Sequence, residues 1–133
     1  MADRMSAEAR SRVMSRIRGA GTGPERAARA ALDAAGVAWV ANVRGLPGRP
    51  DLAVLPARVA VFVNGCFWHR CPRCRPRMPG TNPGFWAKKF RANVRRDVMA
   101  AARLLDMGWA VVVLWECDMA AGLGGLLRLL ANG

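Results

Sequence analysis

Residues 51–66 read Asp-Leu-Ala-Val-Leu-Pro-Ala-Arg-Val-Ala-Val-Phe-Val-Asn-Gly-Cys, two short apolar runs separated by Pro56-Ala57. Short apolar runs of this kind, joined by a break that contains proline, predict a β-hairpin. We therefore expect strands over residues 51–55 and 58–63. Reflecting the hairpin about Ala57 places Asp51 opposite Val63, where the second strand leads into a cysteine.

The segments before this hairpin predict a helix and a further strand. Thr22-Gly-Pro-Glu25 has the spacing of a capping box with a proline near the first helical position, and Gly36 is placed to end the helix. Residues 37–43 then predict a strand, and residues 46–50 a turn.

The segments after the hairpin complete the pattern of an α/β domain. Residues 64–84 are rich in Cys, Pro, Gly and Arg and predict an irregular loop. Apolar residues keep helical spacing over residues 85–105, residues 110–115 form a continuous apolar run, and residues 119–130 predict a leucine-faced helix. This order predicts a mixed β-sheet flanked by helices.

The length and composition predict one packed domain preceded by a basic arm. A chain of 133 residues that is 53% hydrophobic is long enough for one domain and shows no boundary for a second. We assign residues 1–20, which hold five arginines and few large apolar side chains, to a basic N-terminal arm, and residues 21–133 to a single domain.

The charge indicates a nucleic-acid partner. The formal net charge is +12, and the basic residues recur along the whole chain. The first ten residues lack the apolar core of a signal peptide, and no apolar run is long enough to span a bilayer. We therefore expect a cytoplasmic protein with no membrane partner.

Four cysteines and one histidine form a candidate metal site. Cys66, His69, Cys71 and Cys74 lie close together in the sequence, and Cys117 follows the last predicted strand. The Cys71-Pro-Arg-Cys74 spacing allows two thiolates to reach one ion, and four such ligands suit Zn²⁺. Because five candidates compete for four positions, the residues alone leave both a four-cysteine site and a three-cysteine, one-histidine site open.

Asp51 and Glu25 are candidate acidic groups for catalysis. A carboxylate beside a strand-end carbonyl is a natural start for a Mg²⁺ site, which prefers hard oxygen ligands. Each acid also has an ordinary structural role available, Asp51 in turn chemistry and Glu25 in the capping box.

These residues stand within a longer series of motifs that resembles one known family. In order, the motifs are Met14-Ser-Arg-Ile-Arg18, Thr22 with Glu25, Leu46-Pro-Gly-Arg-Pro-Asp51, Val61-Phe-Val-Asn-Gly-Cys-Phe-Trp-His69, Phe85-Trp86, Asn93, Arg96-Asp97, Gly108-Trp109 and Trp115-Glu-Cys117. Over residues 11–119 the chain resembles the very short patch repair endonucleases, which nick duplex DNA beside a T:G mismatch.

The resemblance implies a restriction-endonuclease-like α/β core and assigns the candidate groups. It implies that Asp51 and the Val63 carbonyl bind a catalytic Mg²⁺, that His69 is catalytic, and that Glu25 is an active-site acid. The zinc ligands then become Cys66, Cys71, Cys74 and Cys117. Asn64 stands where better-known members often carry a second histidine, and its amide can orient a water or phosphate but cannot transfer a proton at neutral pH.

The resemblance also implies how the DNA is bound. Phe67, Trp68 and Trp86 match the aromatic residues that the family wedges beside the mismatch, where weakened stacking lowers the cost of insertion. Met14 would enter the opposite groove. Lys89 and Asn93, at positions i and i+4 of the predicted helix, share one face, and this spacing places them toward the mismatched bases or nearby phosphates. We expect a monomer associated with the bacterial nucleoid, with mismatch-repair proteins as candidate partners.

Two other functions remain open at this stage. A restriction-like nicking nuclease that acts in defence against foreign DNA would use the same groups. A non-catalytic, zinc-stabilised DNA-binding module would explain the charge and the cysteines but would leave Asp51, His69 and Glu25 without a role.

Overall fold

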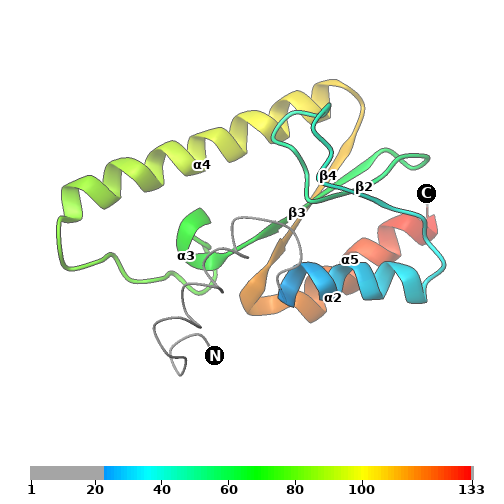
Figure 1. The fold of residues 1–133 in the computed structure, drawn as a ribbon, viewed down its shortest axis with the longest axis horizontal. Coiled ribbons are helices and arrows are strands. Elements are labelled where there is room, and N and C mark those ends of the chain that lie inside the picture. Colours follow the sequence, from blue (N-terminus) through cyan, green and yellow to red (C-terminus); the bar gives the residue numbers. More distant parts are fainter. Residues whose placement is uncertain (1–22, 133) are drawn as a thin grey trace.

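One mixed β-sheet organises the protein, as a computed structural model that describes residues 23–132 shows (Figure 1). The strands are β1 (Val40–Ala41), β2 (Leu52–Val54), β3 (Val59–Asn64) and β4 (Ala110–Trp115), and they lie in the order β1-β2-β3-β4. The pairs β1–β2 and β2–β3 are antiparallel, whereas β3 and β4 are parallel. The predicted mixed α/β architecture is confirmed.

Helices cover both faces of this sheet. They are α2 (Gly23–Ala34), α3 (Cys66–His69), α4 (Pro83–Asp106), the 3₁₀ turn η2 (Glu116–Asp118) and α5 (Met119–Asn132). In Figure 1, α2 and α5 lie side by side on one face, while α4 crosses the other face and extends well beyond the strands, with α3 beside its projecting half.

The main core lies between the sheet and the pair α2 and α5. Alternate residues of the hairpin strands point into it, because successive side chains of a strand face opposite sides of a sheet. Residues at helical spacing on α2 and α5 pack against them from the other side. The buried residues are Ala28, Leu32, Leu52, Val54, Val59, Val61, Leu114 and Leu126. Burial of this apolar surface is the main favourable contribution to folding.

The predicted hairpin is present, but its predicted register is wrong by one residue. The strands pair Leu52 with Val61 and Val54 with Val59, so that the ladder, continued by one residue, sets Asp51 across from Phe62. The cause is the turn, in which the Arg58 N–H bonds to the Leu55 carbonyl at 3.1 Å, so that its centre lies between residues 56 and 57.

Two further predictions need correction. The strand expected over residues 37–43 is only two residues long, and it ends at Ala41 because Asn42 adopts a positive φ of 50° that interrupts extended backbone. The loop expected over residues 64–84 contains the helical turn α3. The predicted helices over 85–105 and 119–130 and the strand over 110–115 are confirmed by α4, α5 and β4.

The proposed arm over residues 1–20, with Met14, lies outside the described residues, and the division into arm and domain stays a prediction. Within residues 23–132, none of the helices combines the length and apolar character needed to cross a membrane.

Gly48 allows the turn before Asp51 to pack closely on the sheet and α4. Its φ is +75°, and a Cβ at this position would lie 2.6 Å from the Ala100 Cβ and 3.2 Å from the Phe62 ring. Both the backbone conformation and the lack of space therefore favour glycine. Since this turn leads directly into Asp51, its packing also sets the position of that carboxylate.

Gly48→Ala should lower the free energy of unfolding by about 2–4 kcal/mol, from left-handed strain together with overpacking. Urea denaturation measures this loss. Gly45→Ala, just before this turn, is the control, because a Cβ there would meet nothing within 4 Å. Equal free energies of unfolding for the two variants would show that a Cβ at position 48 is tolerated beside Ala100, and would contradict the prediction.

Candidate active site and metal centre

Asp51 lies at the centre of the first candidate site, at the point where the turn enters β2. Its Oδ2 accepts a hydrogen bond from the Val63 N–H at 2.7 Å, so that the carboxylate is fixed to the end of β3. The sequence placed Asp51 beside Val63, and the structure brings them together through this contact despite the shifted register. The predicted role of the Val63 carbonyl as a metal ligand stays a prediction.

Glu25 joins Asp51 from the first turn of α2. The Glu25 side chain is only 3% exposed, and it is hydrogen-bonded to the Asp51 carboxyl group. Thus the capping-box position delivers an acid to the same site, which the sequence motif alone did not show. Two carboxyl groups in contact cannot both ionise without strong repulsion.

The environment of Asp51 favours its protonated form. Burial raises the pKa of Asp51 from 3.8 to about 6; the Val63 N–H opposes this, Glu25 adds to it, and the charge of His69 opposes it. A cation beside the buried Glu25 and the half-buried Asp51 would favour the ionised form of Asp51. The hard oxygen donors of Asp51 and Glu25 therefore fit a divalent ion such as Mg²⁺.

His69 lies at the end of α3 and is held by an acid on α4. Its Nδ1 lies 2.6 Å from Oδ2 of Asp97. An acidic partner of this kind fixes the orientation of the imidazole ring. Since His69 also acts electrostatically on Asp51, the structure gathers Asp51, Glu25, His69 and Asp97 into one site.

Asp97 is the site residue that sequence reasoning did not assign. It was noted within the motif Arg96-Asp97 but was given no role, because 28 residues separate it from His69. The available signal was helical spacing, which puts Asn93 and Asp97 on one face of α4. Asn64, predicted to take part in catalysis, is buried at the end of β3, and its role stays a prediction.

The four cysteines form a second site that could hold a metal ion. The sulfur atoms of Cys66, Cys71, Cys74 and Cys117 all lie within 4.8 Å of one another. The Cys71 and Cys117 sulfurs are 3.7 Å apart, and the four cysteines are not joined by disulfides. Four converging thiols are the donor set of a tetrahedral structural zinc site.

Local backbone geometry supports this thiol cluster. The Cys66 N–H donates a hydrogen bond to the Glu116 carboxylate at 3.0 Å. Burial would raise the pKa of Cys71, but hydrogen bonds from the backbone of Cys74 and Arg73 and from neighbouring thiols lower it to about 7. His69 is not a member of the cluster, and its Nδ1 is engaged with Asp97.

An aromatic cluster stands next to His69. Phe67 and Trp68 of α3 make edge contacts with each other and lie against Trp86 of α4, with ring centroids 5.0–6.0 Å apart. Phe90 closes the base of the cluster and is buried, whereas the other three are half-buried. The partly exposed rings remain available for contact with a ligand.

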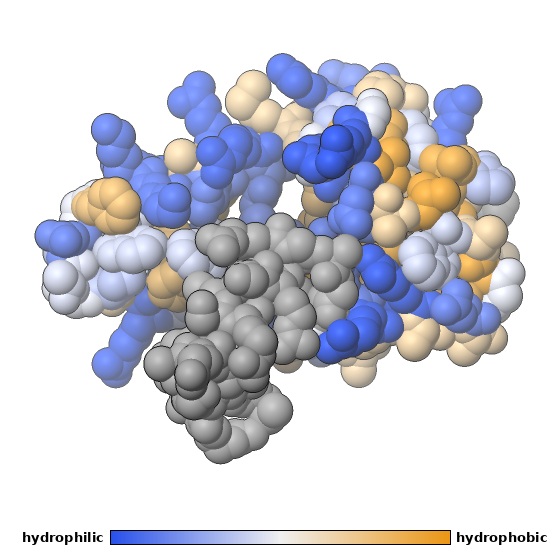
Figure 2. All heavy atoms as spheres, in the orientation of Figure 1, coloured by the Kyte–Doolittle hydropathy of each residue, from blue (hydrophilic) through white to orange (hydrophobic). Residues whose placement is uncertain are grey.

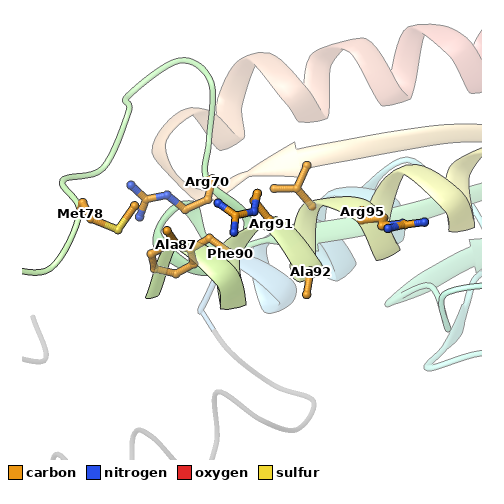
Figure 3. A pocket seen from close by; sticks show the side chains of 8 residues that line it. Arg70, Met78, Ala87, Phe90, Arg91, Ala92 and Arg95 are labelled. Carbon is orange, nitrogen blue, oxygen red and sulfur yellow. The ribbon is translucent and has the colours of Figure 1, made fainter. Parts of the chain in front are cut away.

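Three arginines line a pocket next to Phe90 of this cluster. The Arg70 guanidinium lies 4.3 Å from the ring centroid of Phe90, and Arg91 and Arg95 continue along α4 (Figure 3). In the described part of the chain the ion pairs are His69–Asp97 and Arg73–Asp118, so these three arginines have no acidic partner there. Figure 2 shows hydrophilic side chains along the same projecting half of the molecule.

The predicted DNA-contacting residues of α4 differ in their surroundings. Lys89 is exposed, as a phosphate contact requires. The Asn93 amide donates to the Trp68 carbonyl at 3.2 Å and so already has a partner within the protein.

The site combines a carboxyl pair with a histidine held by an acid, and arginines without an acidic partner among the described residues lie nearby. On a strongly basic α/β domain, this set of groups is typical of nucleases that hydrolyse phosphodiester bonds. The sequence profile described as DNA mismatch endonuclease Vsr matches residues 2–74. A type II nicking enzyme of Xanthomonas oryzae pv. oryzae, V.XorIIP, is 38% identical over 99% of this chain and 96% of its own length.

Two more relatives agree with this match. The DNA mismatch endonuclease Vsr of Escherichia coli is 37% identical over 90% of this chain and 76% of its own length. The type II nicking enzyme V.NaeI of Lentzea aerocolonigenes is 40% identical over 80% of this chain and 67% of its own length. The chain therefore belongs to the DNA mismatch endonuclease Vsr family, and it is a DNA endonuclease.

Removing one thiol should release the metal of the cysteine site. Purified protein should contain about one zinc per chain, as a four-thiolate site requires, and Cys117→Ser should lose it and melt at a lower temperature. Metal analysis and thermal melting measure the two effects. His69→Ala is the control and should keep its zinc; loss of zinc from that variant would make the histidine a ligand.

Replacing Asp51 should stabilise the fold while metal is chelated. Because the folded-state pKa is raised to about 6, the stability linked to this group is present below about pH 4 and lost as the pH rises through 6. In EDTA at about pH 7.5, the free energy of unfolding of Asp51→Asn should therefore be about 1–3 kcal/mol higher than that of the parent. The difference should disappear near pH 4. A less stable variant at pH 7.5 would contradict this electrostatic description.

Proposed function

We propose that this endonuclease nicks one strand of duplex DNA next to a T:G mismatch. The observation that carries the proposal is the position of His69. It lies between the acids of the candidate active site and the half-exposed aromatic cluster, so that strand cleavage and distortion of the base stack would occur at adjoining residues. The family match and the E. coli relative, named a DNA mismatch endonuclease, support mismatch as the substrate feature.

The candidate active site supplies the groups that phosphodiester hydrolysis needs. Asp51, with Glu25 and the Val63 carbonyl beside it, would hold Mg²⁺, which when bound neutralises charge on the scissile phosphate and stabilises the negative charge that develops there. His69 would accept the proton of the attacking water at Nε2, and Asp97 would hold the imidazole by Nδ1. Asn64 would orient the water or a phosphate oxygen.

The surface around this site would bind the duplex. Phe67, Trp68 and Trp86 would insert beside the mismatch, where the loss of stacking costs least. Arg70 and Arg91, which have no acidic partner among the described residues, would contact phosphates together with Lys89, and binding should weaken steeply with salt. The restriction-endonuclease-like core would present these groups from one edge of the sheet. Zinc, bound by the four cysteines, would be structural.

A second candidate is nicking in the service of a restriction system. The relatives V.XorIIP and V.NaeI are named type II nicking enzymes, which supports a link between the family and restriction. The active-site chemistry would be the same, and the two candidates differ in whether a mismatch is required. We infer that the protein acts as a monomer and that repair proteins are its candidate partners.

The decisive experiment is cleavage of duplexes that carry one T:G pair in randomised flanking sequence. A single-strand nick should appear next to the thymine, only with Mg²⁺, and T:A duplexes of the same flanks should be cut at least about 100-fold more slowly. That ratio corresponds to about 3 kcal/mol of discrimination. Sequencing the cut products identifies the flanking bases.

Asp51→Asn is the matched catalytic control. It should bind T:G duplexes but nick them more slowly by two or more orders of magnitude, because it removes a charged group from the phosphate site. Equal nicking of T:G and T:A duplexes would support the restriction role instead. Binding without any nicking by the parent protein would overturn both candidates.

A further inference from the structure

The helical turn α3 cannot hold its own shape. It has four residues, and the backbone bonds at its ends include those from His69 N to Gly65 O and from both Arg70 N and Cys71 N to Cys66 O. So short a helix leaves its last carbonyls without helical partners. Two side chains supply them: the Arg70 guanidinium donates to the Phe67 carbonyl at 3.3 Å, and the Asn93 amide donates to the Trp68 carbonyl at 3.2 Å.

Two residues of α4, one turn apart, hold two consecutive residues of α3. Asn93 holds the backbone of Trp68, and Asp97 holds the imidazole of His69 at 2.6 Å. Positions i and i+4 of a helix share one face, so the two contacts act on α3 from the same side. A displacement of Trp68 relative to α4 must therefore also displace His69.

The hydrogen bonds of Asn93 also fix which way its amide points. Arg96 donates to the Asn93 Oδ1, which leaves the Nδ2 directed at Trp68. Both ends of the amide are thus engaged within the protein. Reading a base edge with this amide would require one of these bonds to break, which would leave the Trp68 carbonyl without a donor.

We propose that Asn93 is a positioning residue that couples Trp68 to His69, so that insertion of the aromatic pair into a mismatch sets the place of the catalytic histidine. The inference rests on the proposed function of that pair. In this role Asn93 does not contact the bases, contrary to the expectation from the sequence. Part of the preference for T:G over T:A then arises in the rate of cleavage and not in binding. A displacement of about 1 Å at a catalytic group can lower a rate about 100-fold.

Asn93→Leu tests this role, because leucine has a similar size and a higher helix propensity than asparagine but cannot donate to Trp68. At saturating enzyme, single-turnover nicking of a T:G duplex should fall about 10- to 100-fold, while the Kd for that duplex changes less than threefold. Nicking of T:A, in which the aromatic pair is not inserted, should fall by a smaller factor, so the preference for T:G over T:A narrows. Met99→Ala, an exposed substitution on the same helix, is the control and should match the parent.

The imidazole itself provides a readout that needs no DNA. His69 is the only histidine, so NMR of labelled imidazole reports on it alone. The proton between its Nδ1 and Asp97 should exchange with solvent at least about tenfold faster in Asn93→Leu than in the parent, as it should in Asp97→Asn, because the hydrogen bond is loosened.

The outcomes separate this inference from the proposed function. A raised Kd or an altered base preference in Asn93→Leu, with an unchanged cleavage rate and imidazole signal, would make Asn93 a base-reading residue and overturn the inference. If the parent protein shows no T:G preference, the proposed function fails, whereas faster proton exchange in Asn93→Leu would still support the coupling. Unchanged exchange would overturn it in either case.

Discussion

The parallel pairing of β3 with β4 is the constraint on which both sites depend. Its last pair joins Asn64 to Trp115, and each chain then runs two residues further to a cysteine, Cys66 on one side and Cys117 on the other. Equal steps from a shared register bring these two sulfurs together. The Glu116 carboxylate, which accepts from the Cys66 N–H, reinforces the same junction. A metal at the thiol cluster would therefore tie together the ends of two strands that are far apart in the sequence, which is where crosslinks restrict an unfolded chain most.

The turn α3 is built on that junction and carries different chemistry at each of its residues. Cys66 belongs to the thiol cluster, Phe67 and Trp68 belong to the aromatic cluster, and His69 faces the acids. A four-residue helix has too few internal hydrogen bonds to keep these directions unaided. Its stability must come from the thiol cluster at one end and from α4 at the other. The long projecting helix α4 is thus a structural support for the active site as well as a basic surface.

The acids of the active site, unlike the thiol cluster, lower the stability of the metal-free protein. Burial beside Glu25 raises the pKa of Asp51 to about 6, which means that the fold works against the ionised form that a divalent ion requires. Such an arrangement weakens the metal-free protein and strengthens the attraction for a cation. The close packing of the turn at Gly48, against Ala100 and Phe62, holds this unfavourable arrangement in place. The protein is therefore less stable at the position of Asp51, where binding of a divalent ion requires an ionised carboxylate.

The sequence by itself determined the elements of the fold and the residue types of both sites. Apolar periodicity predicted α4, β4, α5 and the hairpin, because burial of one face dictates the spacing of apolar residues along each element. Cysteine spacing predicted a metal-binding cluster for a similarly local reason but left His69 as a fifth candidate ligand, and the convergence of the four sulfurs was decided by the tertiary structure. What tertiary structure alone decided is how separate elements meet. The hairpin register depended on a turn whose centre the sequence does not mark, and the Asn93 and Asp97 contacts with α3 join residues that are far apart in the chain. The helical turn over residues 66–69 was missed because it is only four residues long and because part of its support, from Asn93 and Asp97, lies on α4.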